Sequence, residues 1–178
     1  MTTEEQIDLI LFESTMEDYG DAKVAMLKEA VREADAAQIE YMSFKARVFL
    51  MEAAVFSGYS ELALIHFPWI ESTYRKNPGT YDPSSFNWMY SWMTILMSYC
   101  PEIRLEDIQK VMDALEQAFL AQGKSERTLY EIQRTVAIIL GNEAVAAEYQ
   151  AKFELTEYPG HWAFMSGKVN HRAIELHN

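Results

Sequence analysis

The residues with the richest potential chemistry in this chain are one cysteine and four histidines, namely Cys100, His66, His161, His171 and His177. Three of the histidines lie within residues 161–177, and imidazole groups this close in sequence can bind a transition metal. No two of them are spaced four residues apart on a predicted helix, and no cysteine accompanies them. Cys100 precedes Pro101 at the end of an apolar segment, a setting typical of a buried, unreactive thiol. The sequence therefore predicts no metal site.

Motifs of catalysis are absent from the sequence as well. It contains no phosphate-binding glycine loop, no Gly-x-Ser-x-Gly turn and no zinc-binding helix motif. The 27 acidic residues make chance pairs common, and Glu106 with Asp107 belongs to the outer face of an amphipathic helix. We therefore expect a protein that is not an enzyme, has no catalytic residues and needs no cofactor.

The net negative charge of the chain makes some classes of binding partner unfavourable. Its formal net charge is −12, and residues 1–40 hold eleven acidic against three basic residues. Such a field repels phosphate backbones, so nucleic acid is not an expected partner. The longest apolar segment, 88–99, is interrupted by polar residues and is too short to span a membrane. The acidic start of the chain is no signal peptide, and together with the single cysteine it indicates a cytoplasmic setting.

A short pattern recurs three times: a glycine, a polar helix-starting residue close behind it, and an alanine five positions after the glycine. The copies are Gly20, Asp21 and Ala25; Gly58, Ser60 and Ala63; and Gly141, Asn142 and Ala146. The glycine permits a tight reversal, the polar residue caps the next helix, and the alanine allows close approach between helices. The glycines are 38 and 83 residues apart, which predicts a further, degenerate copy near residues 100–103.

Apolar spacing predicts an all-α protein with short connections. The expected helices cover about residues 2–18, 21–36, 37–57, 60–74, 83–100, 105–122, 125–140 and 142–157. Pro68 falls inside the fourth and should bend it. The fifth is apolar on nearly every face and should lie in the middle of the domain.

These residues resemble the tetratricopeptide repeat superfamily, and more narrowly a group of uncharacterised bacterial proteins similar to it. The likeness is carried by Gly58, Ala63 and Phe67, a glycine, a small residue and a large aromatic in the family's order. It implies a right-handed α-α superhelix, or solenoid, of about four antiparallel helical hairpins over residues 1–157. Residues 158–178 would then be a C-terminal tail or a partial capping hairpin. The resemblance implies a binding module and no known reaction.

In such hairpin stacks the first helix of each pair lines a concave groove. Aligning the glycines places Lys45 with Thr128 in this groove, and arginines beside them can grip a carboxylate in a bidentate way. Trp88 and Trp92 offer an apolar floor, although aromatic residues at helical spacing are also typical of a core. The candidate peptide-binding residues are Lys45, Arg47, Glu52, Trp88, Trp92, Thr128, Glu131 and Arg134.

The sequence thus favours a non-enzymatic interaction module that binds a peptide or helix of a partner protein in a concave groove. An alternative is a single-partner inhibitor, such as an immunity-type protein, that covers a basic surface with its acidic N-terminal region. A small-molecule-sensing regulator is a third, weaker interpretation. The oligomeric state stays open.

Overall fold

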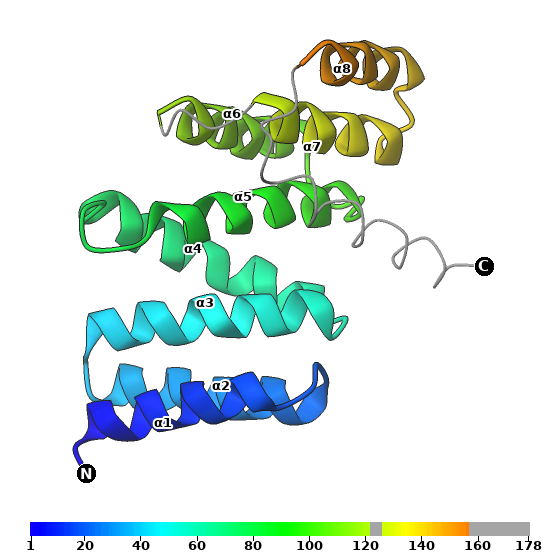
Figure 1. The fold of residues 1–178 in the computed structure, drawn as a ribbon. Helices are drawn as coiled ribbons and strands as arrows, with labels where there is room; N and C mark the ends of the chain where they lie inside the picture. The colour runs from blue at the N-terminus through cyan, green and yellow to red at the C-terminus, as the bar shows by residue number, and fades with distance from the viewer. Residues whose placement is uncertain (122–125, 157–178) are drawn as a thin grey trace. The chain divides into compact units, whose positions relative to one another are not determined.

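The computed structural model describes residues 1–121 and 126–156, and of residues 83–87 and 121 the backbone alone (Figure 1). The described part is helical without strands, and this confirms the predicted all-α class. Its helices are α1 (Thr3–Met16), α2 (Asp21–Ala36), α3 (Glu40–Phe56), α4 (Ser60–Lys76), α5 (Pro83–Ser98), α6 (Leu105–Ala121), α7 (Glu126–Ile139) and α8 (Glu143–Leu155). The proposed cap at 158–178 and three of the histidines lie outside the described residues. No described helix is long and apolar enough to cross a membrane.

The chain forms two compact units, Met1–Val111 and Met112–Asn178, so that the division falls within α6. In the first unit each of α1 to α4 packs against the next helix along the chain, and α3 also contacts both α1 and α5. Helices α1, α3 and α5 therefore share one side of this unit (Figure 1). The second unit is built on the hairpin of α7 and α8.

Alanines allow the helices of the first unit to pack closely. The fully buried apolar side chains of α1, α2 and α3 are a mixture of large residues and alanines: Ile7, Leu27, Ala30, Ala34, Ala46, Leu50, Met51, Ala53 and Ala54. Small side chains at helix contacts shorten the distance between helix axes. Of the alanines in the recurring pattern, Ala63 and Ala146 are buried as expected.

Ala25 is exposed, which contradicts the role expected for it. Gly20 is itself the residue before α2, whereas one residue separates Gly58 from α4 and Gly141 from α8. Ala25 is thus the fifth residue of its helix, while Ala63 and Ala146 are each the fourth. One residue is about 100° of helical rotation, so Val24 takes the buried position instead.

The other two glycines end their helices as predicted. Gly58 has φ +81° and Gly141 has φ +71°, in the left-handed region that favours glycine. Each is followed by an amide that donates to a carbonyl five residues back, Tyr59 to Ala54 at 2.8 Å and Asn142 to Ala137 at 2.8 Å. These bonds satisfy carbonyls that a helix end otherwise leaves unpaired.

A third turn of this kind contains no glycine. Gln38 has φ +56°, and the amide of Ile39 donates to the carbonyl of Ala34 at 3.1 Å. Helix α3 therefore begins at Glu40 rather than at the predicted residue 37. Sequence reasoning missed this turn because glutamine carries no turn signal.

Helices α1 and α5 begin as predicted. The Thr2 hydroxyl accepts a hydrogen bond from the Glu5 amide at 3.2 Å, and the Thr2 amide donates to the Glu5 carboxylate at 2.7 Å. This reciprocal pair is a capping box. Helix α5 starts at Pro83, where the missing amide proton costs nothing.

Candidate functional site

Candidate residues from α3 lie on different faces of that helix. Lys45 and Glu52 point toward α1 and its C-terminal connection, whereas Arg47 points toward α2 and α4. Positions 45 and 52 are seven residues apart, close to two full helical turns, so their side chains share a face. Position 47 is rotated away from both, and Arg47 therefore does not join them.

Polar contacts connect the face of α3 that carries Lys45 and Glu52 to α1 and to Tyr19, in the turn after α1. The Lys45 Nζ lies 2.6 Å from the Asp8 Oδ1, and both side chains are substantially exposed. The Tyr19 hydroxyl donates to the Glu52 Oε1 at 2.7 Å. Burial and this hydrogen bond raise the pKa of Tyr19 to about 12. The tyrosine therefore stays neutral at physiological pH and keeps its proton on the hydrogen bond to Glu52.

An aromatic patch lies on this side of the unit, and we define it as Tyr19, Phe56, Trp88 and Trp92. The Phe56 ring is 5.0 Å from Tyr19, 6.2 Å from Trp88 and 5.4 Å from Trp92, measured between centroids. The last pair meets edge to face, a favourable arrangement for aromatic rings. Tyr19 and Phe56 are exposed, and the two tryptophans are half-buried.

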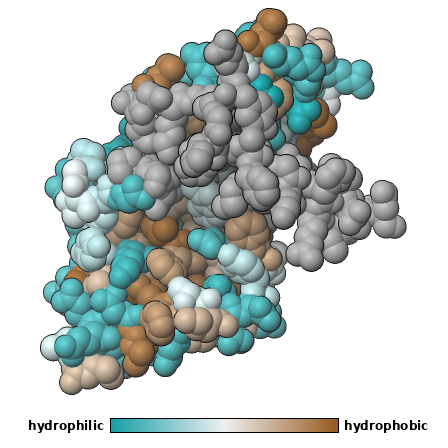
Figure 2. All heavy atoms as spheres, in the orientation of Figure 1, coloured by the Kyte–Doolittle hydropathy of each residue, from teal (hydrophilic) through white to brown (hydrophobic). Residues whose placement is uncertain are grey.

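The patch adjoins a hollow with a polar lining. A cavity of about 180 Å³ is lined by Ser14, Thr15, Tyr19, Lys23, Phe49 and Glu52. The Lys23 ammonium lies 4.3 Å from the centre of the Tyr19 ring and donates to the Glu17 carbonyl at 3.2 Å. Figure 2 shows hydrophobic side chains gathered over the α1 and α3 part of the molecule, with hydrophilic ones around them. This side of the unit thus presents exposed aromatic rings next to a carboxylate.

The opposite face of α3 carries an ion pair in which the arginine is nearly buried and the aspartate is partly exposed. Arg47 binds the Asp35 carboxylate through two nitrogens, at 2.8 Å and 2.7 Å, and its guanidinium lies 4.1 Å from the centre of the Trp69 ring. The hydroxyl of Ser43 donates to Asp35 as well, at 2.8 Å. The Arg47 side chain is only 10% exposed, and its guanidinium donors are therefore used for contacts inside the protein.

The positive charge of Arg47 shifts the pKa values of the two titratable groups beside it, Asp35 and His66. The hydrogen bonds from Arg47 hold the pKa of Asp35 below its usual value, against the opposing effect of burial. Burial lowers the pKa of His66, and the nearby Arg47 charge lowers it further. An open cavity of about 310 Å³ lies beside the ion pair, with Trp69, Glu40 and Gln38 among its lining residues. The cluster stabilises the contact of α3 with α2 and α4.

Candidates Thr128, Glu131 and Arg134 belong to α7 of the second unit. Thr128 is exposed, and Glu131 is half-buried and accepts a hydrogen bond from the Thr135 hydroxyl at its carbonyl. Arg134 donates to the Gln150 side chain of α8 at 2.8 Å. The described contacts of Arg134 thus join the two helices of this hairpin.

Two members of the patch were missing from the sequence-based set. Phe56 is the last residue of α3 and Tyr19 is in the turn after α1. Both stand one or two residues before a glycine turn, and an aromatic in that position is the signal by which they could have been found.

Comparison with family models, with curated proteins and with solved structures found no match to this chain. Function must therefore be inferred from the geometry of the site.

Proposed function

We propose that this chain is a non-enzymatic interaction module, which binds a peptide or helix of a partner protein on the side formed by α1, α3 and α5. The observation that carries the proposal is the aromatic patch. Tyr19 and Phe56 are exposed on a surface that also offers the Glu52 carboxylate. Aromatic rings that stay partly exposed beside a polar rim are typical of protein-binding surfaces.

The proposal includes an architecture, a right-handed α-α superhelix of tetratricopeptide type. Its support comes from the first unit, where α3 contacts both α1 and α5. This is the arrangement in which the first helices of successive hairpins line one side of the stack. The glycine turns after α3 and α7 add support, since both have the same hydrogen-bonding pattern.

The test is a selection of binders from a random peptide library on the full chain. Peptides that use the patch should bind Phe56→Ser at least about tenfold more weakly, which is about 1.4 kcal/mol. Ile65→Ser is the matched control, because Ile65 is an exposed apolar residue of α4. Selected peptides that bind Phe56→Ser as tightly as the parent would exclude the patch as the site.

A second candidate function, the single-partner inhibitor, is favoured by the charge of α1. Residues 1–20 contain six carboxylates and neither lysine nor arginine. Such a surface accelerates association with a basic partner, and the acceleration weakens as salt is added. The two functions differ in whether the aromatic patch or the charge of α1 controls affinity.

A further inference from the structure

Helix α1 presents an apolar stripe on the side away from its own core. Its buried residues are Ile7, Leu11 and Ser14. On the other side Leu9, Phe12 and Met16 are 44%, 60% and 74% exposed. These three residues are spaced by three and four positions, so they form one continuous face of the helix.

The stripe has no partner among the described residues. Helix α1 packs against α2 and α3, and both contacts use the side that carries Ile7 and Leu11. A helix at the edge of a helical stack ordinarily turns a polar face outward. Three large apolar side chains in solvent therefore indicate a surface that another molecule covers.

Uncompensated negative charge accompanies the stripe. Of the six carboxylates in residues 1–20, Asp8 pairs with Lys45 and Glu5 serves the helix cap. No ion pair or hydrogen bond engages the side chains of the other four, Glu4, Glu13, Glu17 and Asp18, within the part of the chain that the structure describes.

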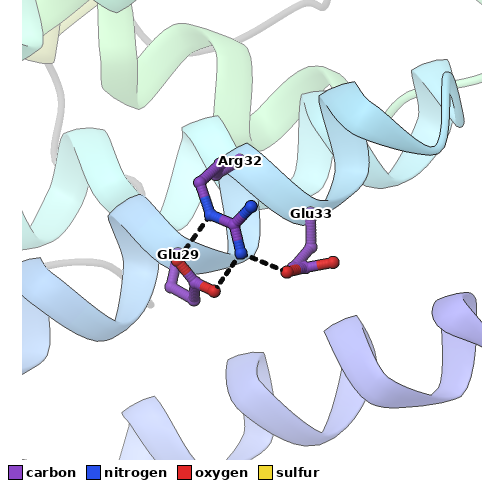
Figure 3. A network of polar contacts seen from close by, with 3 residues as sticks. All are labelled: Glu29, Arg32 and Glu33. Carbon is purple, nitrogen blue, oxygen red and sulfur yellow. Dashed lines mark hydrogen bonds and ion pairs between the residues drawn. The ribbon is translucent and has the colours of Figure 1, made fainter.

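Helix α2 provides the contrast. There Arg32 binds Glu29 through two nitrogens at 2.8 Å and 2.5 Å and also contacts Glu33, so one base engages both acids (Figure 3). No such base is present on α1. Negative charge without a neighbouring base therefore borders the stripe, where Glu13 and Glu17 directly follow Phe12 and Met16.

We propose that this outer face of α1 binds an amphipathic helix whose apolar stripe is flanked by lysine or arginine. The inference is separate from the aromatic patch and does not depend on it. A second copy of this chain is disfavoured as the occupant, because each copy would bring the four carboxylates of α1 and the turn after it, Glu4, Glu13, Glu17 and Asp18, toward those of the other. An anionic membrane surface is disfavoured for the same reason. A basic helix satisfies both observations, since it covers the apolar residues and neutralises the acids.

The probe is a set of dye-labelled helical peptides with the same apolar spacing and with flanks graded from lysine to glutamate. Fluorescence anisotropy with the full chain should show affinity rising with the positive charge of the peptide and falling with added salt. A scrambled lysine peptide of identical composition should bind at least about tenfold more weakly, because its apolar residues no longer share a face.

Variants of the chain then locate the binding. Met16→Ser and Phe12→Ser should each weaken the lysine peptide about tenfold, while Ile65→Ser and Phe56→Ser leave it unchanged. Glu13→Gln with Glu17→Gln and Asp18→Asn should remove most of the salt dependence. The matched charge control is Glu61→Gln with Glu102→Gln and Glu106→Gln, three exposed acids elsewhere in the first unit.

Three results would overturn the inference. One is absence of binding by the lysine peptide, and another is equal binding by the lysine and glutamate peptides. The third is a dimer of this chain, seen by analytical ultracentrifugation, that Met16→Ser dissolves. Loss of peptide binding in Phe56→Ser but not in Met16→Ser would support the aromatic patch and count against the α1 stripe.

Discussion

The basic residues on the two faces of α3 differ in how deeply they are buried and in how many contacts they make. On one face Arg47 is nearly buried, donates two hydrogen bonds from its guanidinium to the Asp35 carboxylate and stacks on the Trp69 ring. On the other face Lys45 keeps 38% of its side chain exposed and reaches Asp8 through a single contact of 2.6 Å. The two bases are only two positions apart, and both fit the same groove hypothesis in the sequence. Their burial decides which of them is engaged within the fold and which stays accessible to solvent.

This difference shows why residue type alone is a poor guide to a binding site. A bidentate arginine that is desolvated and stacked is already committed to its own protein. A solvated lysine gains little from its ion pair and remains exchangeable. Both residues were candidates for the groove, and Arg47 is the one whose contacts are within its own protein.

The largest expected effect is that of Arg47→Ala. The substitution leaves Asp35 without its counter-charge and removes the cover on Trp69, so the free energy of unfolding should fall by about 2 to 3 kcal/mol. The figure lies below that for a fully buried pair because the Asp35 side chain is 45% exposed. Urea denaturation followed by circular dichroism measures the change. If the free energy of unfolding fell by less than about 0.5 kcal/mol, Arg47 would contribute no more to stability than an exposed basic residue does.

The second largest loss of stability is expected from a substitution at Gly58, in the turn that ends α3. A valine at position 58 cannot readily adopt the observed φ of +81°, so Gly58→Val should cost about 1 to 3 kcal/mol. A Cβ there meets no atom within 4 Å, so the cost arises from the backbone rather than from a clash. Gly58→Asn is the matched control, because asparagine tolerates this conformation and should lose less. Thermal unfolding compares the two, and equal losses would contradict the backbone explanation.

The free energy of unfolding should also depend on pH through His66, which lies near the Arg47 ion pair. The pKa of His66 is lowered from its ordinary value of 6.5 by burial and by the charges of Arg47 and Lys28, against an opposing effect of Asp35. Below that ordinary value the unfolded chain binds more protons at this site than the folded protein does. Stability should therefore fall as the pH drops through 6.5 toward the native pKa.

His66→Gln removes that contribution. Denaturation midpoints of the parent and of His66→Gln, taken between pH 7.5 and pH 5, should converge or cross as the pH falls. Parallel curves for the two proteins would show that His66 has the same pKa in the folded and unfolded states.

The smallest effect is expected for Lys45→Ala. An exposed ion pair contributes roughly 0 to 1 kcal/mol, and the free energy of unfolding should stay within about 0.5 kcal/mol of the parent. Lys45→Arg serves as a control for the charge. A loss as large as that of Arg47→Ala would mean that the two faces of α3 do not differ in the way their burial indicates.

Much of the fold could be predicted, and the exceptions have physical causes. Helix starts at Asp21, Ser60, Pro83 and Leu105 agree with the expected positions, because glycines and prolines act locally. The expected side-chain cap forms at Asn142, which accepts from the Val145 amide at 3.3 Å. It does not form at Asp21 or Ser60, because each is the first residue inside its helix and the preceding residue occupies the cap position. The turn at Gln38 was missed because a non-glycine residue takes a positive φ there. Ala25 was misassigned because helix phase depends on where the turn ends, and one residue of difference rotates a side chain from the core to solvent.

By itself the sequence determined the all-α class, the positions of most turns and the concentration of negative charge in the first forty residues. These properties depend on short-range periodicity and on composition. Only the tertiary structure decided that Arg47 is engaged with Asp35 and Trp69, that Phe56 brings Tyr19 together with Trp88 and Trp92, and that the apolar stripe of α1 stays uncovered in the part of the chain described. Each is a contact, or the lack of one, between residues distant in the chain. Such pairings depend on how helices pack, and side-chain spacing along one helix does not specify which neighbour it will meet.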